Sequence, residues 1–234
     1  MLAIYKREMR SYFTTPIGYV FAAIFLSLSA AVFCYTTLYA LSADTSTYFT
    51  AMLVAFVVLL PLLTMKTLSE ERKMRTEQLL LSSPVSLSGM VVAKFLAAFT
   101  VFFGCILLSS LNFIILYTHA EPNTATILGN LLALILVGMA FLAIGIFVSS
   151  LTESQLAASV ITVAILLVLM IISFANSLIS VSWLRFLLSG LSVFSRFQNF
   201  ANGIFDVASL VYYLSLTAVF LFLTVRVYDR RRYA

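Results

Sequence analysis

The chain has 234 residues, of which 62% are hydrophobic and only 10% are charged, and its formal net charge at pH 7 is +5. Soluble domains carry about 25% charged residues, so this composition excludes an ordinary globular protein and indicates a membrane protein. The apolar stretches are long and continuous, whereas the strands of a membrane β-barrel would alternate polar and apolar residues. We therefore expect an all-α polytopic membrane protein with a single domain over residues 1–234.

Residues 1–14, MLAIYKREMRSYFT, predict a helix that lies in the membrane interface. Their apolar side chains fall on one helical face, and three cations fall on another: Lys6, Arg7 and Arg10. Such an amphipathic helix lies along the headgroup layer rather than crossing the membrane. Pro16 then ends this helix and turns the chain into the bilayer.

Six apolar stretches are each long enough, at about 20 residues, to cross the hydrocarbon core as a helix. They cover residues 17–40, 47–66, 91–117, 125–149, 156–179 and 207–228. With a cytoplasmic N-terminus, all 14 Lys and Arg residues except Arg185 and Arg196 fall on the cytoplasmic side. This excess predicts that both termini are cytoplasmic. It also explains the net positive charge through contact with the lipid bilayer, so no nucleic acid partner is expected.

Residues 180–206 form the longest connection on the outer side. They combine aromatic with polar side chains, and Gly190 separates two apolar pieces that are each too short to cross the membrane. Because aromatic residues favour the interface, we predict two short outer helices between the fifth and sixth spans.

Several functions are disfavoured by residues that the chain lacks. No lysine follows a glycine, so the phosphate-binding GK[ST] loop is absent, and the chain is not predicted to be an ATPase or another enzyme. The single histidine, His119, has only Glu121 nearby, so no metal site, catalytic site or bound cofactor is predicted. Charged residues occur only at the ends of the six spans, which disfavours an ion-driven carrier or channel. Lys66, Lys94 and Arg226 are expected to reach the cytoplasmic surface through their long side chains.

The stretch LSEERKMRTEQLLLSSPVS belongs to the predicted cytoplasmic segment 67–88 and is the most charged in the chain. No helix breaker lies between Lys66 and Pro84, so the second span is expected to continue as an unbroken helix into the cytoplasm. Ion pairs within the segment, such as Glu70 with Lys73, would support this helix. The three adjacent leucines at 79–81 form an apolar patch, which favours a protein partner. The alternative is a solvated loop whose charges only set the orientation of the chain.

The connection between the fourth and fifth spans is very short. In its sequence TESQ, Thr152 and the glutamine three residues later have capping-box spacing, so the fifth span is expected to begin near Glu153. Gly138 and Gly145 lie one heptad apart on the fourth span. With the small residues at 157–159 of the fifth span, they offer surfaces for close helix packing.

Several motifs together resemble one protein family. EER is followed by RTEQLLLSSPVS, and AKFLAAF lies at the start of the next helix. Further similar stretches are TTPIGYVF, AIGIFVSSLTESQ and the C-terminal FSRFQNFANGIFDVASLVYYLSLTAVFLFLT. The pattern resembles the permease subunit of the type-2 ABC exporter family over nearly the whole chain, and it is similar to the gliding-motility permease branch in particular. One departure is Arg75, where the family often has a small residue.

The resemblance implies a separate ABC ATPase that docks on the cytoplasmic side. ATP and magnesium would bind to this partner, and the complex would hold two ATPase subunits and two permeases, as a homodimer or a heterodimer. The implied ATPase-coupling residues are Glu70, Glu71, Arg72, Thr76, Glu77, Leu79, Leu80, Leu81 and Pro84. A second cytoplasmic contact is implied for Thr152, Glu153 and Ser154. An external partner or gate is implied at Trp183, Arg185, Arg196 and Phe197.

The expected function is that of the permease subunit of an ABC exporter, a multi-pass protein of the bacterial cytoplasmic (inner) membrane. Because the spans lack buried charge, we expect a lipid-linked or amphiphilic cargo, or work on an extracytoplasmic envelope partner, rather than transport of a small ion. Hydroxyl groups such as those of Ser109, Ser110 and Ser173 could instead line a more polar pathway. The alternative function is a non-transport membrane scaffold for an envelope complex.

Overall fold

The computed structural model describes residues 1–41, 44–74, 86–119, 122–178, 192–201 and 206–232. Within these ranges the chain forms helices and no strand. The helices are α1 (Leu2–Thr14), α2 (Pro16–Phe33), the π-helix η1 (Cys34–Tyr39), α3 (Ser46–Thr64), α4 (Ser69–Lys73), α6 (Leu87–Ser109), α7 (Asn112–His119), α8 (Thr124–Leu151), α9 (Gln155–Leu178), α11 (Val193–Ala201) and α12 (Val207–Arg232).

Six helical stretches of the described chain are long and apolar enough to cross a membrane, which confirms the predicted number of spans. They cover Pro16–Tyr39, Ser46–Lys73, Leu87–Thr118, Thr124–Leu151, Gln155–Ala175 and Val207–Arg231. Residues 2–14 form a separate helix, and Pro16 begins α2 at its first position, where its missing N–H costs nothing. That α1 lies in a membrane interface stays a prediction.

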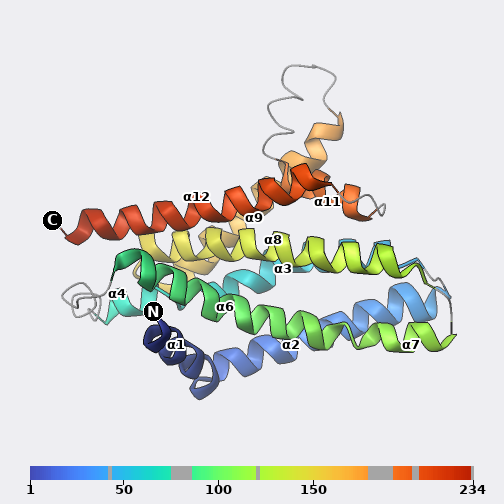
Figure 1. Cartoon of the computed structure of the whole chain (residues 1–234), viewed down its shortest axis with the longest axis horizontal. Coiled ribbons are helices and arrows are strands. Elements are labelled where there is room, and N and C mark those ends of the chain that lie inside the picture. The colour runs from blue at the N-terminus through green and yellow to red at the C-terminus, as the bar shows by residue number, and fades with distance from the viewer. Residues whose placement is uncertain (42–43, 75–85, 120–121, 179–191, 202–205, 233–234) are drawn as a thin grey trace.

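The long helices run side by side as one bundle (Figure 1). Both chain termini and α4 lie at one end, which we call the terminal end, and α7 lies at the opposite end, which we call the far end. The most deeply buried span is α8, which packs against α3, α6, α9 and α12. The core of the bundle is therefore built around α8.

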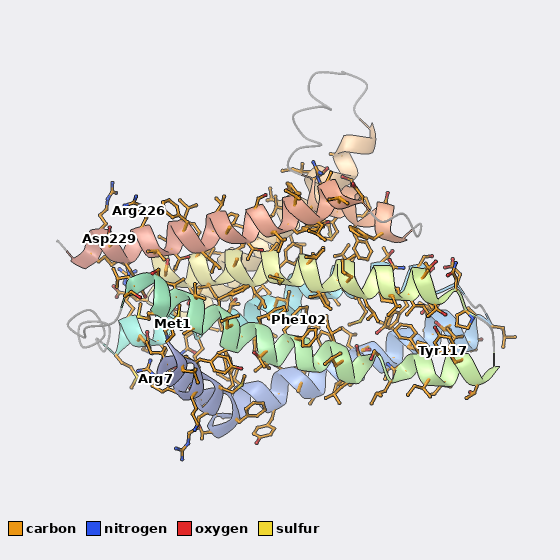
Figure 2. The ribbon with its side chains drawn as sticks, viewed as in Figure 1. Met1, Arg7, Phe102, Tyr117, Arg226 and Asp229 are labelled. Atoms are coloured by element: carbon orange, nitrogen blue, oxygen red, sulfur yellow. The ribbon has the colours of Figure 1, made fainter. Side chains whose placement is uncertain are left out.

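Two glycines let other helices approach α8 closely. A Cβ atom at Gly138 would lie 2.2 Å from the ring of Phe102, the α6 residue labelled in the middle of the bundle in Figure 2. A Cβ atom at Gly145 would lie 2.2 Å from Oγ1 of Thr64 on α3. Close packing at these glycines is confirmed, but at these two positions the partners are α6 and α3 instead of the fifth span.

The second span does not continue as an unbroken helix, so this prediction is wrong. After α3 ends at Thr64, residues 65–68 form a turn, and α4 is a separate short helix. Side-chain hydroxyls take carbonyls that a continuing helix would use, because Thr67 Oγ1 donates to Thr64 O at 2.6 Å and Ser69 Oγ donates to Met65 O. Such local hydrogen bonds compete with the helical pattern.

The far end is held by aromatic rings and hydroxyl groups. The ring of Phe113 on α7 lies 5.8 Å from Phe33, 5.4 Å from Tyr48 and 5.5 Å from Phe49, measured between ring centroids. Edge-to-face and offset contacts at these distances are favourable. The Tyr48 hydroxyl lies 2.8 Å from Ser29 Oγ, so α2, α3 and α7 are joined there. We call Phe33, Tyr48, Phe49 and Phe113 the aromatic cluster.

One of the two short helices predicted on the outer side is present as α11. The other falls on residues outside the described ranges. In α11, Arg196 stacks over the ring of Tyr212 on α12 at 4.4 Å, and Phe197 is 1% exposed. Phe197 therefore packs into the hydrophobic core, whereas the prediction assigned it to an external contact.

Candidate functional site

Six charged side chains meet at the terminal end of the bundle, and we call them the charged junction. They come from α1, from the turn after α3, from α4 and from α6: Arg7, Glu8, Lys66, Glu70, Glu71 and Lys94. Figure 2 shows Arg7 and Met1 at the same end of the bundle as Arg226 and Asp229. The junction therefore joins segments that are far apart in the sequence.

Lys94 lies at the centre of the charged junction and is only 1% exposed. Its Nζ atom lies 3.0 Å from Glu8 Oε1 and 2.9 Å from Glu71 Oε1, and it also donates to the carbonyl of Thr67 at 2.9 Å. These three contacts match the three N–H donors of an ammonium group. A buried cation is tolerated only with such pairing. The prediction that Lys94 reaches the cytoplasmic surface is therefore wrong.

Arg7 ties α1 to the same two carboxylates. Its Nη2 atom lies 2.9 Å from Glu8 Oε1 and 2.8 Å from Glu71 Oε1. Burial would lower the pKa of the Arg7 guanidinium, but the hydrogen bonds and charges of Glu8 and Glu71 outweigh it, so its pKa lies above the ordinary value. Arg7 on α1 and Lys94 on α6 therefore both pair with Glu8 and Glu71, although the two cations are far apart in the sequence.

Helix α1 is also fixed by uncharged contacts. Tyr12 donates to the carbonyl of Leu63 at 3.2 Å, and burial, followed by the charge of Glu8, raises the pKa of Tyr12. The Tyr5 hydroxyl lies 3.0 Å from Oγ1 of Thr100 on α6. The amphipathic helix therefore packs on the bundle through its apolar face, as expected for a helix that is apolar on one side only.

A second set of contacts joins α4 to the end of α8. Ser149 Oγ accepts hydrogen bonds from the backbone N–H groups of Leu68 and Ser69 at 3.2 and 3.1 Å. These are amides at the start of α4, which lack partners within the helix itself. Arg72 donates to the carbonyl of Leu151 at 2.6 Å and lies 3.1 Å from Glu153 Oε1.

Arg72 and Glu153 were predicted in two different cytoplasmic contacts, and the structure brings these two residues together. Their ion pair connects α4 to the short connection between α8 and α9. In this connection Ser154 caps α9, because its Oγ accepts from the Ala157 N–H at 3.5 Å, while Thr152 Oγ1 donates to Val148 O. The cap is therefore Ser154 instead of the predicted Thr152, and α9 begins at Gln155, close to the predicted start near Glu153.

A family model described as ABC-2 family transporter protein matches residues 42–227. The chain belongs to this family. It is therefore a multi-pass membrane component of an ABC transporter, and the family implies partnership with an ABC ATPase subunit. A comparison with curated proteins found no match. The matched range includes Glu71, Arg72 and Lys94 but begins after α1.

The other predicted site residues of this ABC-2 family member fall into two groups. Glu70 lies 3.1 Å from Lys66 in an i,i+4 ion pair, and among the described residues no ion pair joins Glu70 to Lys73. The remaining residues lie outside the described ranges: Thr76, Glu77, Leu79, Leu80, Leu81, Pro84, Trp183 and Arg185. Their roles in coupling and in an external contact stay predictions.

Sequence reasoning missed Glu8 and Lys94 as site residues. Glu8 is the single acidic residue of residues 1–14, and Lys94 is the single charged residue of α6. A cation in an apolar span, such as Lys94, is costly without an opposite charge, which Glu8 can supply. Their complementary charges were the signal that could have paired them.

Proposed function

We propose that this ABC-2 family member is the permease subunit of an exporter in the bacterial cytoplasmic membrane. It would couple ATP hydrolysis by two copies of a separate ATPase to movement of a lipid-linked or amphiphilic cargo, or to work on an envelope partner. One observation carries the proposal: α4, which leads into the predicted ATPase-coupling segment, is tied to α1, α6 and α8 by the charged junction and by Arg72 and Ser149.

The break between α3 and α4 changes how force would pass into the membrane. A rigid continuous helix would transmit a push from the ATPase along α3 alone. With a turn at residues 65–68, the push on α4 passes instead through Glu71 to Lys94 on α6 and to Arg7 on α1. Discrete ion pairs between packed helices can shift as a unit, as in other switching proteins. The ATPase stroke would therefore move several spans together.

The proposed orientation places the terminal end in the cytoplasm. Arg226 of α12 lies there with the charged junction, in agreement with the positive-inside rule (Figure 2). Arg231 donates to the carbonyl of Ser150 at 2.8 Å, so this cationic end is anchored to α8. The chain itself would not hydrolyse ATP, because ATP and magnesium would bind to the partner.

The cargo proposal rests on the charge-poor spans. In the described part of the chain, the charged groups of the spans gather at the terminal end, and the buried one, Lys94, is neutralised by Glu8 and Glu71. A small ion would find no opposite charge deeper in the bundle. Assembly with a second permease, membership of the gliding-motility branch and contact of α11 with an extracytoplasmic partner are further parts of the proposal.

The proposal is tested by co-purifying the chain with its ABC ATPase subunit. Glu153→Lys and Leu80→Asp alter the two predicted contacts, and Asp229→Lys is the matched control, because Asp229 is a half-exposed carboxylate at the same end of the bundle. We expect the wild type and Asp229→Lys to retain the ATPase, and the two contact variants to lose it or to lose coupled hydrolysis. Equal binding and hydrolysis by all four proteins would contradict the proposed contacts. If the complexes are stable but no amphiphile alters their ATP hydrolysis, the alternative function of a non-transport membrane scaffold is favoured.

A further inference from the structure

A cavity of about 340 Å³ opens beside the charged junction. Its walls come from α1, from the turn after α3, from α4 and from Lys94 of α6. Six charged side chains line it, and their signs balance: the cations Arg7, Lys66 and Lys94 and the carboxylates Glu8, Glu70 and Glu71. A ligand that carries both charges would fit this balance better than a simple anion or cation.

A second, entirely apolar groove of about 150 Å³ adjoins this cavity. It lies between α2 and α3 and is lined by side chains that include Pro16, Val20, Ile24, Leu59 and Leu62. The two spaces lie close together, because Thr15 and Lys66 line the cavity while their chain neighbours Pro16 and Met65 line the groove.

The groove has the position and length of an acyl-chain site. From Pro16 to Ile24 it follows α2 for about 12 Å at 1.5 Å per residue, which is close to half of a hydrocarbon core of about 30 Å. Val20 is 51% exposed and Ile24 is 41% exposed, so the groove is open along its side. A polar cavity at the end of an apolar groove therefore matches one amphiphile, with a charged head and a hydrocarbon tail.

We infer that the cavity and the groove together bind one zwitterionic phospholipid whose headgroup carries a phosphate and a primary ammonium group. Arg7 is 52% exposed and uses only Nη2 for its two ion pairs, so its remaining N–H groups can bind phosphate oxygens. Glu70 pairs with Lys66 through Oε2, and its carboxylate can accept further hydrogen bonds from the ammonium. The tail lies in the groove between α2 and α3.

This lipid would occupy the leaflet at the terminal end. Its headgroup would bridge α1 and α4, and its tail would bridge α2 and α3, so it would add to the contacts that already join α1 and α4. The site needs no ATPase, so its test is independent of the proposed exporter function.

The test is native mass spectrometry of the purified full-length chain after exposure to equal amounts of phosphatidylethanolamine, phosphatidylcholine and phosphatidylglycerol. We expect the wild type to retain one phosphatidylethanolamine, because phosphatidylcholine lacks ammonium N–H donors and phosphatidylglycerol lacks the cation. Equal retention of all three lipids would overturn the inference.

Two variants separate the head site from the tail site. Val20→Trp fills the groove and should abolish selective retention, while Val211→Trp is the matched control, since Val211 is a 57% exposed valine on α12. Glu70→Gln should reduce the preference for phosphatidylethanolamine by about tenfold, as expected when a hydrogen bond to a charged group is weakened. Retention by Val20→Trp equal to that of Val211→Trp, or an unchanged preference in Glu70→Gln, would overturn the inference.

A competition experiment distinguishes a lipid from a soluble headgroup. Free phosphoethanolamine carries the same charges without the tail. We expect that it leaves the retained lipid in place, because it cannot fill the groove. Displacement of the lipid by free phosphoethanolamine would overturn the groove as part of the site.

Discussion

The two ends of the bundle are held together by different interactions. At the terminal end, the buried Lys94 pairs with Glu8 and Glu71, and hydrogen bonds from Arg72 and to Ser149 join α4 to α8. At the far end, the aromatic cluster packs ring against ring, and its polar contacts are short hydroxyl bonds such as that between Ser29 and Tyr48.

This difference indicates which end is built to change. Ring packing stabilises a single arrangement, because many weak contacts are lost together when the rings separate. The ion pairs of the charged junction involve only a few groups on separate helices, and Glu71 contacts both Arg7 and Lys94, so α1, α4 and α6 can move as one unit. The terminal end therefore has the interactions of a transmitting region, and the far end has those of a fixed one.

The largest expected effect is that of Lys94→Met. Removing the cation leaves Glu8 and Glu71, which are 13% and 15% exposed, with Arg7 as their remaining ion-pair partner of the charged junction. Breaking a buried ion pair from one side costs about 3–5 kcal/mol. Denaturant titration of the purified protein in detergent should show this loss in the free energy of unfolding.

Lys73→Met is the control for this variant, because Lys73 is exposed at the end of α4. We expect it to change the free energy of unfolding by less than about 0.5 kcal/mol. A triple variant in which Glu8 and Glu71 also become glutamine should recover most of the stability, because no unpaired charge then remains buried. Equal stability of Lys94→Met and Lys73→Met would contradict the account of the junction.

A smaller loss is expected for Phe113→Ala in the aromatic cluster. Phe113 is 4% exposed, and its removal leaves a cavity and ends three ring contacts. Because lipid tails are as apolar as the core, the transfer term is weak in a membrane, and we expect about 2 kcal/mol from lost packing. Ile114→Ala, at an exposed neighbouring residue of α7, should change the same unfolding titration little. A loss in Ile114→Ala as large as that in Phe113→Ala would show that the cluster is not specific.

The smallest effect is expected for Ser149→Ala, and it should be local. The amides of Leu68 and Ser69 lose their acceptor, which costs about 1 kcal/mol for a lost helix cap. Hydrogen exchange should become faster at these two amides and in α4. Ser150→Ala is the neighbouring control, because the Ser150 hydroxyl donates to the Phe147 carbonyl of its own helix. Unchanged exchange in Ser149→Ala would remove Ser149 from the coupling contacts.

The sequence predicted the spans because their signal is local. Uninterrupted apolar runs and Pro16 depend only on nearby residues, and the six spans and α1 followed from them. The break before α4 was missed because no proline or glycine marks it. The break depends on side-chain hydroxyl groups such as that of Thr67, which donates a hydrogen bond to a backbone carbonyl of the helix. Such competition with the helical hydrogen bonds is difficult to recognise in a sequence.

The charged junction could be predicted only in part. Glu71 and Arg72 were identified through a family resemblance, whereas Glu8 and Lys94 are joined to Glu71 only by the packing of α1 and α6. A long lysine side chain near the end of a span commonly extends to the surface, so its burial depends on tertiary contacts. Such contacts bring residues 8, 71 and 94 together without any local pattern in the chain.

The most direct test of the account is a distance measurement in the complex with the ATPase. Spin labels at Lys6 and Lys73, both exposed, report on the distance between α1 and α4, in a background where Cys34 and Cys105 are replaced by serine. A second label pair, at Lys73 and Tyr39, reports on movement of α4 relative to the far end. We predict that ATP changes the second distance and leaves the first unchanged, because the charged junction carries α1 and α4 together. A change in the distance between Lys6 and Lys73 as large as that between Lys73 and Tyr39 would contradict the junction as the path of coupling.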